Sequence, residues 1–437
     1  NKVIIPGLID AMTTLSESGR DDEETVTPDI RALDAFDFFG KYRRLLAGGV
    51  TTVHIAPGRR RLVPGYGAVV KLAGDSPDQQ VLQDLAGLGV VLGEPSKTNV
   101  PMIFDPPVPP SPDNQVEPAV RQLPTTRMGQ MALLREVLSQ ARWDKAQSKP
   151  LDARTQGLLQ VLEGRQVLRV NCHVAQDIRN ALTLARNYEL DLVIEGATEA
   201  YKLIDEIKAV EAAVVVASDL EPGRRHKRDY ARPEANGRPS PDNVKALADA
   251  CIDFALASPT DQTVGDLQFI AGYAVRRGLS PEQALESVTI SPARILGIAE
   301  RVGSIEPGKD ADLVILSADP FKVTCVVEQA MVNGKSVYGQ AVQTAEQKVD
   351  DKSVTAIRAG RMLTASRGQI LNGLILIQDG KIIYSGQDKY LPPGAAVIDA
   401  SQDVVIPGMI DIHSHLGLHA DSMALSSGNP GPGPNAS

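Results

Sequence analysis

Two histidines near the end of the sequence have the spacing of a metal site. His413 and His415 are separated by one residue and follow an apolar run that predicts a β-strand. Alternate side chains of a strand point to the same face, so both imidazoles reach one side of it. Two neutral imidazoles on a rigid element suit zinc or another divalent metal, and we expect these two residues to be ligands.

The segment that contains this pair occurs a second time at the start of the chain. Residues 3–15 and 404–416 align without gaps, and seven of the thirteen positions are identical. This agreement predicts a tandem duplication, with the first copy lacking its beginning and the second lacking nearly everything after its beginning. Met12 and Thr14 occupy the positions of the two histidines in the first copy. Neither side chain can replace imidazole for a borderline divalent metal.

The elements that position these residues are predicted from hydrophobic patterns. Short apolar runs alternate with helical patterns, which indicates βα units around a parallel sheet, and about eight such units would close a barrel. The predicted strands are Val3–Ile9, Thr51–Ile55, Gly89–Leu92, Val167–Val170, Leu192–Ile194, Ala213–Ala217 and Phe254–Ala257. The predicted helices are Met128–Arg142, Ala175–Tyr188, Ala197–Val210 and Pro241–Ala250.

Two further helix starts carry capping signals, and a different texture follows them. Ser280 precedes Pro281 and a Gln at the third helical position, and Ser291 precedes Pro292. Both patterns predict an N-cap serine followed by a first-turn proline. Beyond them, short strand runs are separated by turn signals, which predicts a small all-β module. These runs are Gly303–Leu316, Cys325–Val332, Lys335–Tyr338, Val354–Ala359, Leu371–Gln378, Lys381–Tyr384 and Ala396–Ile398.

Composition marks the boundaries between these parts. The proline-rich segment Glu94–Thr126 predicts a long loop over one end of the barrel, and polar Gly339–Lys352 predicts a linker between the copies. We therefore expect a barrel at 1–300, sandwich strands of the first copy at 301–340, a linker at 341–352, sandwich strands of the second copy at 353–403, and the start of a second, truncated barrel at 404–437.

Length and charge limit the class of protein. A chain of 437 residues with 43% hydrophobic residues suits a large barrel plus a smaller domain. The formal net charge of -9 argues against nucleic acid as the main partner. The basic clusters at 59–61 and 224–228 are local exceptions, which we interpret as solvated loop charges.

Cysteines and hydropathy bear on the compartment. The three cysteines are far apart and predict no disulfide framework. No apolar run has the length of a membrane span, and the sequence begins without a charged and apolar leader. We expect a soluble protein of the cytoplasm or the periplasm, with no membrane partner. Both ends of the sequence have the look of cut positions within a longer protein.

Five stretches resemble the amidohydrolase superfamily, specifically its imidazolonepropionase-like members. They are PGLID at 6–10, AGGVTTV at 47–53, GAVVKLAG at 67–74, GLSPEQALESVTISPARILGI at 278–298 and VGSIEPGKDADLVIL at 302–316. The resemblance implies an α/β fold with a (β/α)8 TIM-like barrel and a small β-sandwich domain. It also implies hydrolysis of C–N bonds in small-molecule or peptide amides. One or two divalent metals, often zinc, would activate a water, with a strand-eight Asp as base.

The positions at which this resemblance implies metal ligands hold other residues. Besides the two strand-one positions, Asn171 stands in place of the His after strand five, and Gly196 in place of the His after strand six. Pro259 stands in place of the strand-eight Asp, and Asp261 follows two residues later. Losing all four histidines together removes the means of holding a metal, so we expect none in the first barrel and no intact catalytic residue there.

Three other polar residues lie in the matching stretches. His173 follows the strand-five position by two residues, and Lys71 lies in GAVVKLAG. Both are candidate pocket residues, with a structural role as the alternative for each and as the default for Lys71. His54 follows a predicted strand and is interpreted as a packed loop histidine.

Two functions stay open. In the first, the full-length protein is a tandem amidohydrolase whose second copy hydrolyses C–N bonds, while this chain alone is inactive. In the second, the first barrel is a non-catalytic pseudoenzyme that serves as a scaffold or binding module, paired with the second copy or with a like chain. A structural possibility is that the strands at 354–400 complete the sandwich of the first copy, as in a circular permutation.

Overall fold

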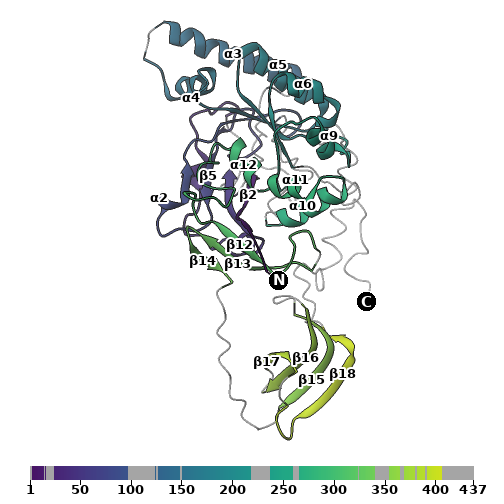
Figure 1. Ribbon diagram of the computed structural model, residues 1–437. Coiled ribbons are helices and arrows are strands. Elements are labelled where there is room, and N and C mark those ends of the chain that lie inside the picture. The colour runs from purple at the N-terminus through teal and green to yellow at the C-terminus, as the bar shows by residue number, and fades with distance from the viewer. Residues whose placement is uncertain are drawn as a thin grey trace, which may run out of the picture. The chain divides into compact units, whose positions relative to one another are not determined.

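A computed structural model shows the arrangement of most of the chain. It describes residues 2–13, 15, 24–96, 124, 126–147, 150–217, 237–258, 265–322, 324–339, 354–364, 369–378, 381–388 and 391–405. The chain divides into two compact units, Asn1–Val342 and Gln343–Ser437 (Figure 1). In the part of the chain with described structure, no helix has the length and apolar character needed to cross a membrane.

The largest sheet of unit 1 has six strands, in the order β11-β10-β9-β8-β7-β4. The five strands from β7 to β11 run parallel to one another, and β4 pairs antiparallel with β7 at the edge. The strands are β4 Gly65–Tyr66, β7 Leu88–Val91, β8 Leu168–Cys172, β9 Leu192–Gly196, β10 Ala213–Val216 and β11 Phe254–Leu256. All but β4 were predicted, because buried parallel strands form nearly continuous apolar runs.

A second sheet of unit 1 has the order β2-β3-β5-β6. Its strands are β2 Leu8–Thr13, β3 Val50–Ile55, β5 Ala68–Lys71 and β6 Val81–Gln83. The pair β2 and β3 is parallel, whereas β5 pairs antiparallel with both β3 and β6. The two sheets share an interior, because one buried hydrophobic cluster draws side chains from both, including Ile9, Ala11, Val69, Val193, Val215, Ala255 and Ala257. The fold of unit 1 is therefore α/β with mixed sheets around a common core.

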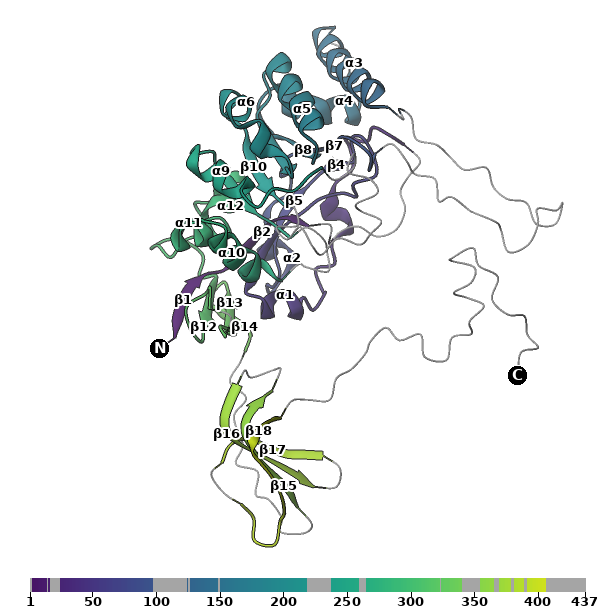
Figure 2. The same cartoon turned by 90° about the vertical axis from the view of Figure 1, so that its right-hand side faces the viewer.

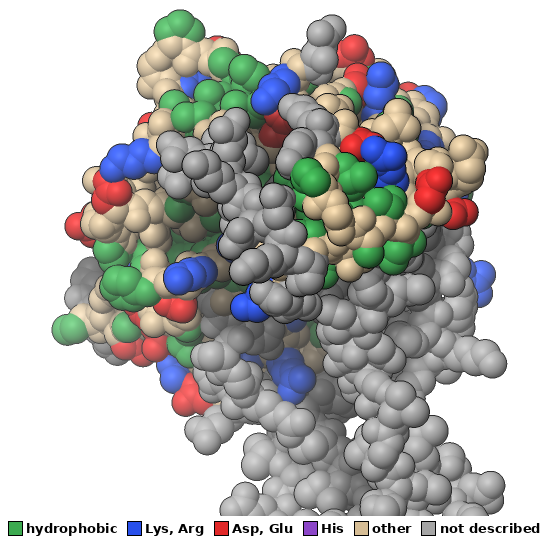
Figure 3. Space-filling view, turned by 90° about the horizontal axis from the view of Figure 1, so that it is seen from below, with side chains coloured by type: hydrophobic (Ala, Val, Ile, Leu, Met, Phe, Trp, Pro, Cys, Tyr) green, Lys and Arg blue, Asp and Glu red, His purple; other side chains and the backbone are tan. Residues whose placement is uncertain are grey.

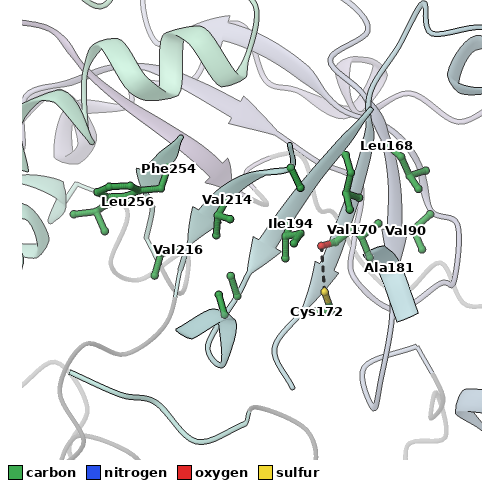
Figure 4. Packing of buried hydrophobic residues seen from close by; sticks show 14 of the residues in the cluster. Val90, Leu168, Val170, Cys172, Ala181, Ile194, Val214, Val216, Phe254 and Leu256 are labelled. Atoms are coloured by element: carbon green, nitrogen blue, oxygen red, sulfur yellow. Dashed lines mark hydrogen bonds between the residues drawn. The ribbon is translucent and has the colours of Figure 1, made fainter. Parts of the chain in front are cut away.

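The helices of unit 1 lie on the outer side of these strands (Figures 1 and 2). Side chains of the parallel strands pack against them, as Val90 and Val170 do near Ala181 of the helix that follows β8, and Ile194 and Val214 continue this row on the neighbouring strands (Figure 4). The α-helices are α1 Arg43–Ala47, α2 Pro77–Gln80, α3 Arg127–Ala146, α4 Ala153–Leu162, α5 Ala175–Tyr188, α6 Ile204–Ala209, α9 Asn243–Asp249, α10 Leu267–Arg276, α11 Pro281–Glu286 and α12 Ile290–Ile295. Two short 3-10 helices are η1 Ala32–Ala35 and η2 Ala200–Lys202.

Of three predicted helix starts, one is confirmed and two are wrong. The capping box at Ser280 is present, with reciprocal bonds to Gln283. The predicted cap at Ser291 is wrong, because Thr289 is the N-cap and Ser291 lies inside α12. The helix predicted from Ala197 begins later, as η2 and α6, because Gly196 and Ala197 both have positive φ angles that are incompatible with a right-handed helix.

A small antiparallel sheet completes unit 1, in the order β1-β12-β13-β14. Its strands are β1 Val3–Pro6, β12 Leu313–Leu316, β13 Val327–Val332 and β14 Lys335–Tyr338. The prediction of one strand over Val3–Ile9 is wrong, because the chain leaves this sheet at Gly7 and enters the other sheet as β2. A Cβ at Gly7 would lie 2.1 Å from the hydroxyl of Thr51, so the close approach requires glycine.

Unit 2 is a four-stranded sheet in the order β17-β16-β15-β18. Its strands are β15 Thr355–Leu363, β16 Gln369–Gln378, β17 Lys381–Gln387 and β18 Ala396–Val405. The first three form an antiparallel meander, and β18 pairs parallel with β15. All four are longer than predicted, since polar residues extend each apolar run. A circular-permutation role for these strands stays a prediction.

Charged side chains are mixed in sign on the face of the molecule seen from below. Figure 3 shows Lys and Arg interspersed with Asp and Glu over this face, among hydrophobic side chains. A phosphate-binding surface would need basic side chains gathered together. On the described part of this face, no such gathering is visible (Figure 3), and the absence of a nucleic-acid partner stays a prediction.

Candidate functional site

The predicted ligand positions of the first copy lie where strands of both sheets reach their carboxyl ends. Met12 lies near the end of β2, Asn171 near the end of β8, and Gly196 at the end of β9. In parallel α/β folds, ligands bind at the carboxyl ends of the strands. We call this end of unit 1 the carboxyl end, and it is the candidate site.

Two of the former ligand positions touch one another directly. The Nδ2 of Asn171 lies 3.7 Å from the Sδ of Met12, and both residues are buried. The amide donates to the thioether, which is a weak acceptor and a poor ligand for zinc. The structure thus brings these positions together, as the resemblance implies, but in a contact that leaves neither side chain facing a metal.

The third position is filled by a neighbouring imidazole. Gly196 has a φ of +83°, and a Cβ added there would lie 2.6 Å from the His173 ring. The Nδ1 of His173 is 2.8 Å from the hydroxyl of Thr198, with the donor set by the tautomer. His173, a predicted pocket residue, therefore occupies the space that any side chain at position 196 would need.

Five other predicted site residues lie outside the described residues. They are Thr14, Pro259, Asp261, His413 and His415. Over the stretches that are described, no group of three or more His, Cys, Asp or Glu side chains has the arrangement of a metal site. Met12, Asn171 and Gly196 offer a thioether, an amide and no side chain, so these residues do not fit a zinc ion.

Asp10 lies in β2, two residues before Met12, and was not singled out from the sequence. Its carboxylate accepts from the backbone N–H groups of Met12, at 3.2 Å, and Ser258, at 3.3 Å. Burial raises its pKa from 3.8 to about 6, against the lowering effects of the Ser258 and Met12 hydrogen bonds and the charge of Arg59. The link to Ser258 joins β2 to the segment after β11, so Asp10 ties the two sheets together.

His54 was predicted to lie in a loop, but it lies within strand β3. It is 1% exposed, and a Cβ at Gly67 would lie 2.4 Å from its Nε2. Burial lowers its pKa well below the ordinary value, and the charge of Arg169 lowers it further. The backbone of Ala86 raises the pKa, but by less than these two effects lower it. His54 is therefore a packed, neutral imidazole, in agreement with its predicted packing role.

A buried ion pair crosses the interior between β8 and β9. The Nε of Arg169 donates to Glu195 at 2.7 Å, and its Nη2 donates to the Ala11 carbonyl of β2 at 2.9 Å. The side chains are 3% and 6% exposed. The sequence contained a signal that was missed, since charged residues at inward positions of apolar strands are rarely buried unless paired.

Lys71 does not join this group. Where β5 pairs with β3, Lys71 lies opposite Thr52 and Ala68 lies opposite Ile55. The lysine therefore lies toward the amino end of β3. The amine is fully buried and forms ion pairs with Asp310 at 2.8 Å and Asp312 at 2.9 Å, beside the small sheet. Its assignment as a pocket residue is therefore wrong, and its default structural role agrees with these contacts.

The basic cluster after β3 differs from its prediction. Arg61 is 5% exposed, and its Nη1 donates to the hydroxyl of Thr27 at 2.9 Å. Arg59 is half-buried, and its charge acts on both Asp10 and His54. Of the three arginines only Arg60 is exposed. The interpretation as solvated loop charges is thus wrong for Arg59 and Arg61. The second basic cluster, residues 224–228, lies outside the described ranges.

Comparison with known proteins gives this fold and site a family. Residues 170–337 match the model of the Amidohydrolase family. The imidazolonepropionase of Picrophilus torridus is 37% identical over 101 residues, which are 21% of this chain and 26% of the relative. That of Thermoplasma acidophilum is 52% identical over 83 residues, 18% of this chain and 20% of the relative. The amidohydrolase tasK of Hapsidospora irregularis is 24% identical over 360 residues, 74% of this chain and 35% of the relative.

A solved structure extends the likeness to most of unit 1. The amidohydrolase from Thermotoga maritima MSB8 has a TM-score of 0.65 and 28% identity, over 78% of this chain and 88% of that one. The chain belongs to the amidohydrolase superfamily. Within it, the relatives identify an imidazolonepropionase-like member, as the sequence motifs predicted. The chain spans only about a quarter of the length of the first two imidazolonepropionases it matches.

Proposed function

We propose that this chain is part of a hydrolase that acts on C–N bonds of small-molecule or peptide amides. The proposal is supported by the relatives, which include enzymes named imidazolonepropionase and amidohydrolase. We further propose that the two sheets of unit 1 form the wall of one (β/α)8 barrel, since they share one interior cluster. In this proposal the barrel over 1–300 does not hold the metal.

The contact between Met12 and Asn171 carries this part of the proposal. A metal between β2 and β8 would need both side chains to point at it, whereas they point at one another at 3.7 Å. The third position cannot supply a ligand, because His173 occupies its space. A metal-activated water needs these ligands, so no hydrolytic step is assigned to this site.

The metal-dependent step belongs, in our proposal, to the second copy. His413 and His415 retain the imidazole pair that the first copy has lost. They would hold zinc or another divalent metal together with ligands from later strands of a complete second barrel. The first barrel would then be a partner of that copy in one polypeptide.

Zinc analysis of the purified chain tests the division of labour. The chain is prepared with zinc, dialysed and measured by elemental analysis beside the double variant His413→Ala/His415→Ala. We expect any zinc on the parent chain to be lost from the double variant, because no group of three or more metal-binding side chains is found among the described residues of unit 1. One zinc per chain retained by the double variant, together with amide hydrolysis, would contradict the proposal.

A second candidate function is a pseudoenzyme scaffold or binding module, paired with another chain. It is favoured by the complementary packing of the former site, where Met12, Asn171 and His173 have found new partners. Sedimentation of the chain across concentration tests pairing between like chains. A purely monomeric chain would contradict homo-oligomer formation, and hydrolysis by a longer protein that needs His413 would favour the first candidate.

A further inference from the structure

A surface groove of unit 1 lies between helix α10 and the segment that joins β12 to β13. It has a volume of about 240 Å³, and Gly48 lies at one of its borders. Gly48 comes just before β3, at the amino end of that strand, whereas the altered ligand positions Met12 and Asn171 lie near the carboxyl ends of β2 and β8. The groove is therefore separate from the candidate site.

One face of α10 forms the first wall of this groove. Phe269, Gly272, Tyr273 and Arg276 all line it, and their spacing places them on one side of the helix. Phe269 is 61% exposed, so its ring is available at the surface. Gly272 leaves the centre of this face flat, since a Cβ added there would come within 3.7 Å of Phe321 on the other wall. The helix thus offers aromatic rings on either side of a bare stretch of backbone.

The opposite wall is held in place by its own hydrogen bonds. The Nε2 of Gln268 in α10 donates to the carbonyl of Pro320 at 2.6 Å, which ties the two walls together. The backbone N–H of Phe321 donates to the carboxylate of Asp319 at 3.0 Å, and the Phe321 ring packs against the main core. Both walls are therefore formed before a ligand binds, which lowers the entropy cost of binding.

The charges around the groove favour an anion. Arg276 and Lys322 both line it, both are exposed, and neither has an ion-pair partner in the described part of the chain. The acidic lining residue is Asp266, which is the N-cap of α10, whereas Arg276 is the last residue of that helix. The two lie about 15 Å apart along the helix axis. The groove therefore has a net positive charge, in a chain whose net charge is -9.

We propose that this groove binds a small aromatic carboxylate. The ring of the ligand lies over Gly272, against the aromatic side chains Phe269 and Phe321, because aromatic rings pack well on one another. Its carboxylate is bound by Arg276 and Lys322 through charge-assisted hydrogen bonds. The volume is below the roughly 300–1,000 Å³ of pockets for drug-sized ligands, so a single ring suits it. This inference does not depend on the metal content of unit 1.

Titration of the full chain with three probes tests the site. Benzoate has both the ring and the charge, benzamide has the ring alone, and acetate has the charge alone. Binding is measured by ligand-observed NMR and by calorimetry at constant ionic strength. We expect benzoate to bind about two- to fivefold more tightly than benzamide, as for an exposed ion pair, and acetate to bind more weakly than either.

Two variants separate binding from folding. Gly272→Ala fills the flat centre of the groove, and alanine is the better helix former, so the melting temperature should be kept or raised while benzoate binding is lost. Arg276→Gln/Lys322→Gln should weaken benzoate binding about fivefold or more and leave benzamide binding unchanged. Arg186→Gln is the matched control, because Arg186 is exposed in the last turn of α5 and does not line the groove.

Three outcomes would overturn the inference. The first is equal affinity for benzoate and benzamide, which would show that the two cations do not act on the ligand. The second is unchanged benzoate affinity in Gly272→Ala, and the third is an equal loss in the Arg186→Gln control and the double variant. Each of these leaves the proposed function untouched, since the zinc analysis that tests it concerns other residues.

Discussion

At the scale of single residues, the described positions at which the family resemblance implies metal ligands make packing contacts in unit 1. The thioether of Met12 accepts from Asn171, and the ring of His173 fills the space beside Gly196. Each contact is local and modest in energy. We propose that these positions contribute packing and do not hold a metal.

The raised pKa of Asp10 predicts a distinctive pH dependence of stability. The folded pKa of about 6 lies above the unfolded value of 3.8, so the folded state binds more protons between these two pH values. Stability from this group is complete below pH 4 and is lost as pH rises through 6, by about 3 kcal/mol. We expect Asp10→Asn to lose less stability than the parent across this window. Urea unfolding at pH 4, 5, 6 and 7 measures the difference, and parallel curves would contradict the assignment.

Gly196 should tolerate no side chain while His173 is present. Alanine at this position adds a Cβ 2.6 Å from the ring, in addition to the strain of a positive φ, with an expected cost of about 1–3 kcal/mol. Gly164→Ala is the matched control, since its φ is +68° with nothing within 4 Å of the added Cβ. Adding His173→Ala should recover part of the loss at Gly196. Equal melting temperatures for the two glycine variants would show that the ring does not restrict this position.

At the scale of elements, the charges inside the strands hold the two sheets in place. Arg169 of β8 binds Glu195 of β9 and the backbone of β2, so one side chain spans three strands. Buried pairs of this kind add little net stability compared with apolar residues of similar size. Their removal one at a time is costly, because the partner is left charged and without water.

This asymmetry gives a prediction for the ion pair. Arg169→Met should destabilise unit 1 by about 3–5 kcal/mol, because Glu195 keeps its charge in the interior. The double variant Arg169→Met/Glu195→Leu should recover most of that loss. Chemical unfolding of both variants beside the parent measures the coupling. A double variant as unstable as the single would mean that the shape of the guanidinium group, and not its charge, matters here.

Helices and strands could be predicted from the sequence where the pattern of their own residues is enough to specify them. The strands β7 to β11 and helix α5 follow from apolar runs and helical periodicity. The break at Gly7 and the late start of α6 were missed, since they depend on a close approach to Thr51 and on positive φ angles. In the site, motif positions predicted Met12 and Asn171. Asp10 and Glu195 were missed, because their contacts join segments that are distant in the sequence.

At the scale of the whole molecule, the chain contains two compact units with separate hydrophobic cores. Unit 1 has a large core that links its sheets and helices. Unit 2 has only small clusters, one of which contains Val354, Ala356, Leu374 and Leu376. Since stability depends on the apolar area buried, the smaller unit should be the less stable one.

We accordingly expect two transitions in calorimetry, with unit 2 melting first. Leu374→Ala removes a fully buried side chain of unit 2 and should lower that transition by about 2–5 kcal/mol in stability, while the other stays unchanged. Leu371 lies in the same strand but is 60% exposed. Leu371→Ala is therefore the control, and it should change the stability of unit 2 little. A single transition shifted as a whole by Leu374→Ala would show that the two units unfold together.

The position of Lys71 has a consequence for the history of this chain. Its ion pairs with Asp310 and Asp312 fasten the small sheet near the amino end of β3, whereas the altered ligand positions lie at the carboxyl ends of β2 and β8. The stabilising ion pairs and these positions therefore lie toward opposite ends of the strands of unit 1. Mutational drift at one end leaves the other undisturbed, so a lineage can lose its metal ligands without losing its architecture. The inherited scaffold then remains open to selection for a different task.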